Sequence, residues 1–360
     1  MKRSKYATVI FPLFFCIAIL TSTCLATEPV FSGEKNAPPP RIIRTCCSFG
    51  AEVEMAAVRF IKISDITSKD AIGQHVYLGN KLEGNGIIYT KRGGFIDLGH
   101  LRDCADWTAY LYHQIKTQQT SDPFSLKLGN EAGTKILTIN AFNPDSLPDY
   151  YELAAKIAYD LSLWHEIATW FGASYIPLVP ERYSSFSPED LYSNLLGTYI
   201  GKKALQSDMP YNEAMTFYIN EMLDSLESVS TYEETYAAMQ KVEHLWWTSE
   251  ERLPSKRVLM KRYYDCNDNS SLAPWTIDEI ENPYILNKAP QELENNYLFW
   301  VKVNYKIPTA SGEKAEGSKI MTQFDFDGLI NLAEYEVWKM EEKERLSRKL
   351  IQKKMEYDEG

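Results

Sequence analysis

The pattern of apolar and polar positions changes once along the chain, close to Asp97. Between residues 42 and 97, apolar and polar residues alternate in short runs separated by glycines, which is typical of short strands. We expect a strand at 75–79 and a hairpin in which 87–89 pairs with 95–96 through the turn KRGG. Beyond Asp97 the apolar residues recur every three or four positions, which indicates helices. The pattern therefore predicts an α+β protein that is predominantly α-helical, with a small N-terminal β region.

The second part of the chain is expected to form a helical core, followed by a C-terminal hairpin and a terminal helix. The spacing predicts helices at 98–114, 150–172, 187–205, 211–226, 231–247 and 329–357. Ser187 precedes Pro188 and two acids, so we assign it as an N-cap and not as a nucleophile. Residues 296–307 and 320–326 are predicted to pair as the C-terminal hairpin.

The N-terminus has the features of an export signal. Three cations within the first five residues precede an apolar run at 6–20, and small residues lead up to Ala26. A membrane anchor needs a longer apolar run, and a lipid-bearing Cys24 would need a leucine where Thr21 stands. We therefore expect cleavage after Ala26, a periplasmic or secreted protein, and no membrane span after cleavage.

The chain divides into four segments by composition. Residues 1–26 are the predicted signal peptide, and 27–41 form a polar, Pro-rich linker. Residues 42–328 are expected to form the main globular domain, and 329–360 a charged C-terminal helix.

Acidic residues outnumber basic ones, which excludes one class of partner. The chain has 38 Lys and Arg against 49 Asp and Glu, and loss of the three N-terminal cations makes the mature charge 35 − 49 = −14. A protein this acidic has no electrostatic reason to bind nucleic acid. The 44% hydrophobic and 13% aromatic content is ample for a packed core.

Four cysteines remain after the predicted cleavage: Cys46, Cys47, Cys104 and Cys266. Export permits disulfides, but neighbours such as Cys46 and Cys47 rarely bond to each other. We expect at most one bridge to Cys266 and a buried, free Cys104.

The helix predicted at 98–114 carries a polar stripe at its start. Asp97 suits the N-cap position, and His100 and Asp103 lie beside the apolar face of the helix. Asp106, by contrast, projects to the side that we expect to face solvent.

The helix predicted at 150–172 has a similar border, formed by His165 with Glu166 one step further round. If the two borders meet, four residues converge in one half-buried cleft: His100, Asp103, His165 and Glu166. Such a cleft can hold a divalent metal such as zinc through His100, Asp103 and His165, with Glu166 as a base for bound water. It can equally act as a metal-free acid–base pair.

Two observations limit the interpretation of this cleft as a catalytic or metal site. Histidines and acids at the edge of a core commonly form hydrogen bonds with each other and do nothing more. The segment HEIAT also departs from the zinc-protease pattern HExxH, because Thr169 replaces the second histidine.

The segment RDCADW suggests a different chemistry. It is similar to the DCSG helix start of papain-like cell-wall peptidases, but Ala105 and Asp106 replace Ser and Gly. We therefore expect an inert Cys104.

A calcium loop is an alternative near the C-terminus. In QFDFDGLINLAEYE, the acids Asp325, Asp327 and Glu334 follow the spacing of an EF-hand loop, but Gln323 stands at the first ligand position. We prefer a strand that ends at Phe326 and an Asp327 that caps the terminal helix.

Four blocks of the sequence carry a family resemblance: RTCCSFG, RGGFIDLGHLRDCADW, WHEIATWFGAS and SSFSPEDLYSNLLGT. They resemble an uncharacterised family of exported bacterial proteins, catalogued as domain of unknown function 4056. The resemblance implies a bacterial source and an envelope location, and it carries no activity over to His100 or His165.

Two classes of function follow. The first is a cell-envelope hydrolase, metal-assisted or metal-free, that uses the histidine and acid cluster. The second is a noncatalytic envelope binding or structural protein, in which the same residues form a core hydrogen-bond network.

The export signal gives a direct test. Mass spectrometry of the mature protein is expected to find Thr27 as its first residue, because the small residues before it suit a signal peptidase. An uncleaved or lipid-modified N-terminus would contradict the predicted localisation.

Overall fold

The computed structural model describes residues 39, 44, 49–55, 58–63, 66–118, 122–143, 146–174, 181–265, 270–303, 307–308 and 319–358. The predicted signal peptide, and the linker apart from Pro39, lie outside the described residues. Cys46, Cys47 and Cys266 also lie outside them, so the disulfide prediction stays a prediction.

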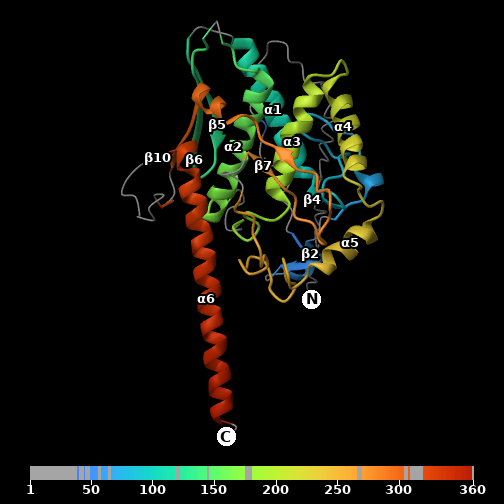
Figure 1. Cartoon of the computed structure of the whole chain (residues 1–360), viewed down its shortest axis with the longest axis vertical. Coiled ribbons are helices and arrows are strands. Elements are labelled where there is room, and N and C mark those ends of the chain that lie inside the picture. Colours follow the sequence, from blue (N-terminus) through green and yellow to red (C-terminus); the bar gives the residue numbers. More distant parts are fainter. Residues whose placement is uncertain are drawn as a thin grey trace, which may run out of the picture.

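Three helices form the centre of the molecule. These are α1 (Leu98–Gln118), α2 (Tyr150–Trp170) and α3 (Asp190–Leu205), each in contact with the other two. Further helices are α4 (Tyr211–Ser225), which packs on α3, and α5 (Tyr232–Lys241), which contacts a small hairpin. Figure 1 shows the three central helices between a sheet on one side and α4 on the other. The predicted α+β fold with a helical core is confirmed.

A four-stranded antiparallel sheet covers the outer side of α2. Its order is β10 (Lys319–Thr322), β9 (Tyr297–Val303), β6 (Gly133–Ile139) and β5 (Phe124–Asn130). The predicted C-terminal hairpin is present as β9 and β10, but the sequence pattern missed β5 and β6. The inner face of the sheet buries Leu137 and Phe299 towards α2. The Trp164 and Phe299 rings meet edge-on, with their centroids 6.5 Å apart.

Small β elements complete the fold. They are β1 (Val53–Met55), β2 (Val58–Ile63), β3 (Ile87–Thr90), β4 (Gly94–Asp97), β7 (Ser271–Leu272) and β8 (Leu286–Asn287), with short 3-10 turns η1 (Lys69–Ala71), η2 (Gln291–Asn296) and η3 (Gln323–Asp325). The β3–β4 hairpin has the predicted register, with Tyr89 opposite Phe95.

The strand predicted at 75–79 is wrong. Consecutive backbone N–H groups in this segment donate to side chains instead of to a neighbouring strand. The N–H groups of His75 and Tyr77 donate to Thr216 and Asn212 on α4, and that of Leu78 donates to Asp106 on α1. The segment is therefore a loop that is held by side chains of two helices.

Two helix ends differ from the sequence prediction. The N-cap of α3 is Glu189 and not Ser187, and its side chain makes no capping hydrogen bond. Helix α5 begins with a Thr231–Glu234 capping box, but it ends at Lys241 and not at residue 247. The Trp247 side chain beyond it is fully buried in a second, smaller core.

The terminal helix α6 (Phe326–Asp358) begins one residue after η3. Thr322 and Asp325 form a capping box at this junction, whereas Asp327 lies inside the helix. The predicted strand end at Phe326 and cap at Asp327 are therefore wrong. Because Asp327 and Glu334 are helical, this segment does not form an EF-hand loop.

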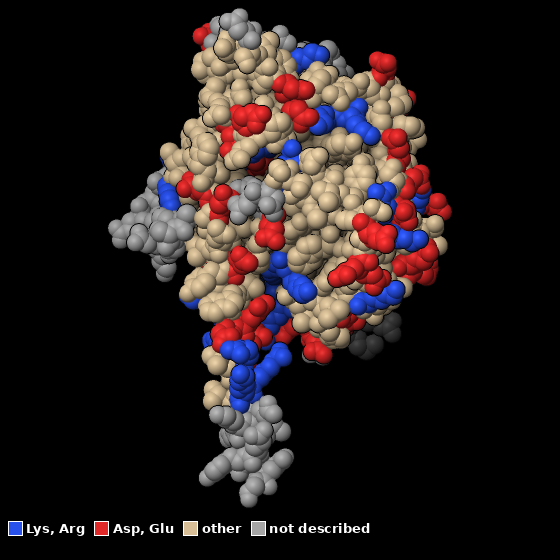
Figure 2. Space-filling model, viewed as in Figure 1, with Lys and Arg blue, Asp and Glu red and all other residues tan. Residues whose placement is uncertain are grey.

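Helix α6 extends away from the body of the molecule (Figure 1). Trp338, Leu346 and Leu350 are at least half exposed along it. Figure 2 shows Lys and Arg gathered on its projecting part. Among the described residues, no helix has both the length and the apolar character needed to cross a bilayer.

Helices α1 and α3 approach each other closely because of two glycines, Gly197 and Gly201, one turn apart on α3. A Cβ atom added at Gly197 would lie 2.1 Å from the carbonyl oxygen of Leu101, and one at Gly201 would lie 2.9 Å from the Cα of Ala105. The two backbones therefore pack without an intervening side chain on α3.

We expect Gly197→Ala to lower the free energy of unfolding by about 1–3 kcal/mol, because overpacking outweighs the gain in helix propensity. Gly201→Ala is the matched control and should cost less, since its nearest contact is longer. Urea denaturation measures both. A Gly197→Ala variant as stable as the natural protein would contradict this account of the α1–α3 contact.

Candidate functional site

The start of α1 positions the first histidine. Asp97 ends β4, and its Oδ1 accepts hydrogen bonds from the N–H groups of Gly99 at 2.7 Å and His100 at 3.0 Å. The predicted N-cap role of Asp97 is thereby confirmed. The cap fixes His100 in the first turn of α1, with only 10% of its side chain exposed.

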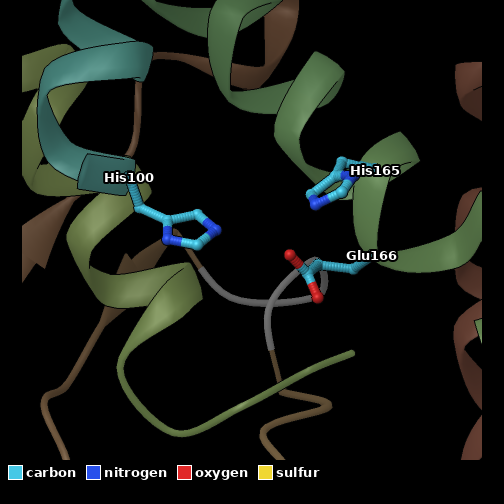
Figure 3. Close-up of side chains that lie close together, drawn as sticks. All are labelled: His100, His165 and Glu166. Atoms are coloured by element: carbon cyan, nitrogen blue, oxygen red, sulfur yellow. The ribbon is translucent and has the colours of Figure 1, made fainter. Parts of the chain in front are cut away.

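His165 and Glu166 come from the second half of α2 and face the same space as His100 (Figure 3). The two imidazole centroids are 6.4 Å apart, with their planes inclined at 33°. One ligand atom from each of these three residues lies within 4.8 Å of the others. The structure therefore brings together three of the four residues that the sequence selected.

A carboxylate orients each imidazole from behind. Glu131, in the turn between β5 and β6, has its Oε1 2.8 Å from His165 Nδ1. Its other oxygen accepts from Lys135 at 3.0 Å. Contact through Nδ1 directs the other ring nitrogen of His165 towards His100, as Figure 3 shows. Glu131 could not be predicted as a site residue, because the pattern of the chain did not indicate its hairpin.

His100 has two carboxylates on its Nδ1 side. Asp97 Oδ2 is 3.2 Å and Asp190 Oδ1 is 3.3 Å from this nitrogen. Asp190 is the first residue of α3, and from the sequence it was predicted only as a first-turn acid. Burial raises the pKa of Asp190 well above its usual value, although His100 opposes the shift.

Glu166 is almost completely buried, with 1% of its surface exposed. Its Oε2 accepts a hydrogen bond from the N–H of Phe186 at 2.6 Å. Its Oε1 is buried and accepts no hydrogen bond, and Figure 3 shows one carboxylate oxygen directed towards the imidazoles. A buried acceptor without a donor is costly, so this oxygen is available to a ligand.

Asp103, the fourth predicted residue, belongs to a different cluster. Its Oδ1 accepts from Arg44 Nη1 at 2.9 Å and is not among the ligand atoms that converge on His100 and His165. Arg44 also binds Glu83 at 2.7 Å and Asp106 at 2.9 Å.

The expectation that Asp106 faces solvent is wrong. It is 1% exposed, and it contacts His75 Nε2 at 3.1 Å in addition to Arg44. Burial alone would raise the pKa of Asp106, but Arg44 and His75 outweigh it and hold the pKa below its usual value. The helical projection failed because the far side of α1 is covered by segments distant in sequence.

Cys104 is buried and free, as predicted. Its thiol lies 3.3 Å from Asn194 Oδ1, and burial raises its pKa to about 12. A thiol in this state is not the thiolate nucleophile that cysteine peptidases require.

The sequence model of a family described as "Protein of unknown function (DUF4056)" matches residues 34–276, and the chain belongs to this family. The match includes every residue of the site described above. Neither a curated protein nor a solved structure matches the chain.

Cys104 gives a test of the chemistry. Iodoacetamide at pH 8 should leave the Cys104 peptide unmodified in the native protein and modify it after denaturation, since almost no thiolate forms at a pKa of about 12. Peptide mass spectrometry reads out each cysteine separately. Rapid labelling of native Cys104 would contradict the assignment of an inert thiol and would support a cysteine-peptidase function.

Proposed function

We propose that this member of the DUF4056 family is an exported, metal-assisted hydrolase whose zinc ion is held by His100, His165 and Glu166. The observation that carries the proposal is the convergence of one ligand atom from each residue within 4.8 Å. The N-terminal sequence supports export to the periplasm or the cell surface.

The ligand chemistry favours zinc. Two imidazoles and one carboxylate are a known ligand set of catalytic zinc in hydrolases, and three protein ligands leave the fourth position open. Tetrahedral coordination with bonds of about 2.0–2.1 Å puts ligand atoms about 3.4 Å apart. The present ligand atoms lie within 4.8 Å of one another, so the side chains would move closer together on binding the ion. In this arrangement Glu166 is a ligand and not the base that the sequence suggested.

The surroundings of both histidines fit a metal site. A metal-bound histidine usually contacts a carboxylate through its other nitrogen, which fixes the tautomer and raises ligand basicity. Glu131 fills this position at His165, and at His100 the carboxylates of Asp97 and Asp190 lie 3.2 Å and 3.3 Å from Nδ1. Side-chain exposures of 10% for His100 and 17% for His165 allow solvent to reach the pair.

The chemistry follows from the open position. A zinc ion lowers the pKa of bound water to about 7, so that hydroxide is present at neutral pH. Held by His100, His165 and Glu166, the ion would supply the nucleophile for hydrolysis at a carbonyl or phosphoryl centre. The two imidazoles would hold the ion in a fixed position.

We expect His165→Ala to abolish zinc binding and hydrolysis with little loss of stability, because the side chain serves the metal and not the core. Elemental analysis of the purified protein, a screen of chromogenic ester, amide and phosphate substrates, and urea denaturation measure the three effects. His113→Ala, further along α1, is the control and should keep the metal.

The opposite result identifies the noncatalytic alternative. A protein without metal, in which His165→Ala lowers the free energy of unfolding by about 1–3 kcal/mol through unpaired buried partners, would show a structural hydrogen-bond network instead of a hydrolase.

A further inference from the structure

Helix α6 carries an exposed apolar surface along one face. It consists of four side chains, between 48% and 69% exposed: Tyr335, Trp338, Leu346 and Leu350. At 100° per residue they fall within about 120° of one another around the helix axis. The rings of Tyr335 and Trp338 lie nearly parallel, with their centroids 5.7 Å apart. We refer to these four residues as the α6 stripe. Exposed apolar residues that gather on one face, instead of lying scattered, mark an interaction surface.

The opposite face of α6 is attached to the body of the protein. Val337 and Met340 pack on the main core, and Arg257 Nε binds Glu344 Oε1 at 2.8 Å. These contacts fix the rotation of the helix about its axis, so that the α6 stripe faces away from the body. Figure 1 shows the helix projecting from the body towards the C-terminus.

The charge of α6 changes sign close to its midpoint. Residues 334–344 contain five Glu against two Lys, whereas residues 345–351 contain two Arg, one Lys and no acid. Glu342 lies halfway between the ends of the helix at 326 and 358. Within the same helix, Arg345 Nη2 donates to Glu342 Oε1 at 2.6 Å. The helix is therefore an acidic half followed by a basic half, with an ion pair at the junction.

A second copy of α6 that runs in the opposite direction matches the α6 stripe in a single register. In a two-fold symmetric dimer, each contact between two different residues occurs twice. The register that sets Trp338 against Leu346 of the second copy also sets Tyr335 against Leu350. The whole α6 stripe is then paired. The centre of this contact is Glu342, so the two helices overlap over their full length.

The charges agree with the same register. It places Glu334 opposite Lys349 of the second copy, and Glu341 close to Arg345. The acidic half of each helix thus lies along the basic half of the other, and complementary charges fix the register of a contact. A parallel arrangement would set the two acidic halves against each other. An anionic lipid surface would repel the acidic half of the helix.

We infer that the α6 stripe binds a second copy of this chain, in an antiparallel two-helix contact that makes the protein a symmetric dimer. The contact covers Tyr335 and Trp338 of each copy, and Tyr and Trp are among the residues that contribute most to binding at interfaces. Helix α6 lies beyond residue 276, where the family match ends. The inference does not depend on the proposed zinc site.

Sedimentation equilibrium on the mature chain tests the inference. We expect a dimer at about 100 µM that dissociates on dilution. Trp338→Glu and Leu346→Glu should each weaken dimerisation by at least about 10-fold, because each places a charge in the apolar contact. Ile351→Glu is the matched control: Ile351 is exposed on a different face of α6, so this variant should dimerise as the natural protein does. Circular dichroism and urea denaturation establish that every variant is folded.

Charge reversal tests the direction of the contact. Glu334→Lys and Lys349→Glu should each weaken dimerisation by at least about 3-fold, because each sets like charges opposite one another. The double variant should recover the natural affinity, since it exchanges the signs of a pair that spans the two copies. In a parallel dimer these two residues do not face each other. A double variant without recovery would therefore contradict the antiparallel arrangement.

Three further outcomes would overturn the inference. These are a chain that stays monomeric at every concentration, a dimer that Trp338→Glu and Leu346→Glu leave unchanged, and a monomer that binds phosphatidylglycerol vesicles through Trp338. The last would show that the α6 stripe meets a lipid surface instead. His165→Ala should dimerise as the natural protein does, so the failure of the zinc function and the failure of the dimer are distinguishable.

Discussion

The contact between α1 and α3 is the constraint on which the rest of the structure depends. Gly197 and Gly201 let the two backbones meet without a side chain of α3 between them. This contact sets the start of α3 against the start of α1, so that Asp190 reaches His100. A bulkier α3 face would separate these helix ends and remove the acids behind the imidazole. The small residues of a buried helix thus determine the electrostatics of the site.

Two buried ionic clusters on α1 behave in opposite ways. On one side of the helix, Arg44 forms ion pairs with Asp106 and Glu83, and all three of its side-chain nitrogens donate hydrogen bonds. That cluster fastens Arg44 to the core. On the other side, Asp190 Oδ1 lies 3.3 Å from His100 Nδ1, and neither Glu189 nor Asp190 has a Lys or Arg partner among the described residues. Burial therefore raises the pKa of both carboxyls well above their usual values.

Helix α2 shows why the site is rigid. It contacts α1 and α3 on one side and α6 on another, and the sheet covers its outer face. The helix is therefore apolar almost all round, with Trp164 and Trp170 fully buried. Polar side chains on such a helix are few, and His165 and Glu166 are held by partners from the turn at Glu131 and from Phe186. Packing fixes their positions before any ligand arrives.

The sequence by itself determined the local elements and part of the site. Helical periodicity located α1 and α2, the acid at residue 97 marked the start of α1, and the polar borders of the two helices correctly predicted that His100 and His165 lie close together. The helices and their polar borders depend on residues within a few turns of each other, whereas the meeting of the two borders depends on the packing of α1 against α2.

Only the tertiary structure decided which acids join the histidines and which do not. Glu131 reaches His165 from a hairpin 34 positions earlier, and Asp190 reaches His100 from another helix. Asp103 was lost from the site because Arg44 binds it from 59 positions away. A helical projection shows which side of a helix is apolar, but it contains no information on which distant segment covers the polar side. Burial and charge pairing at such a distance are set by the packing of the whole chain, and for that reason the site became complete only in three dimensions.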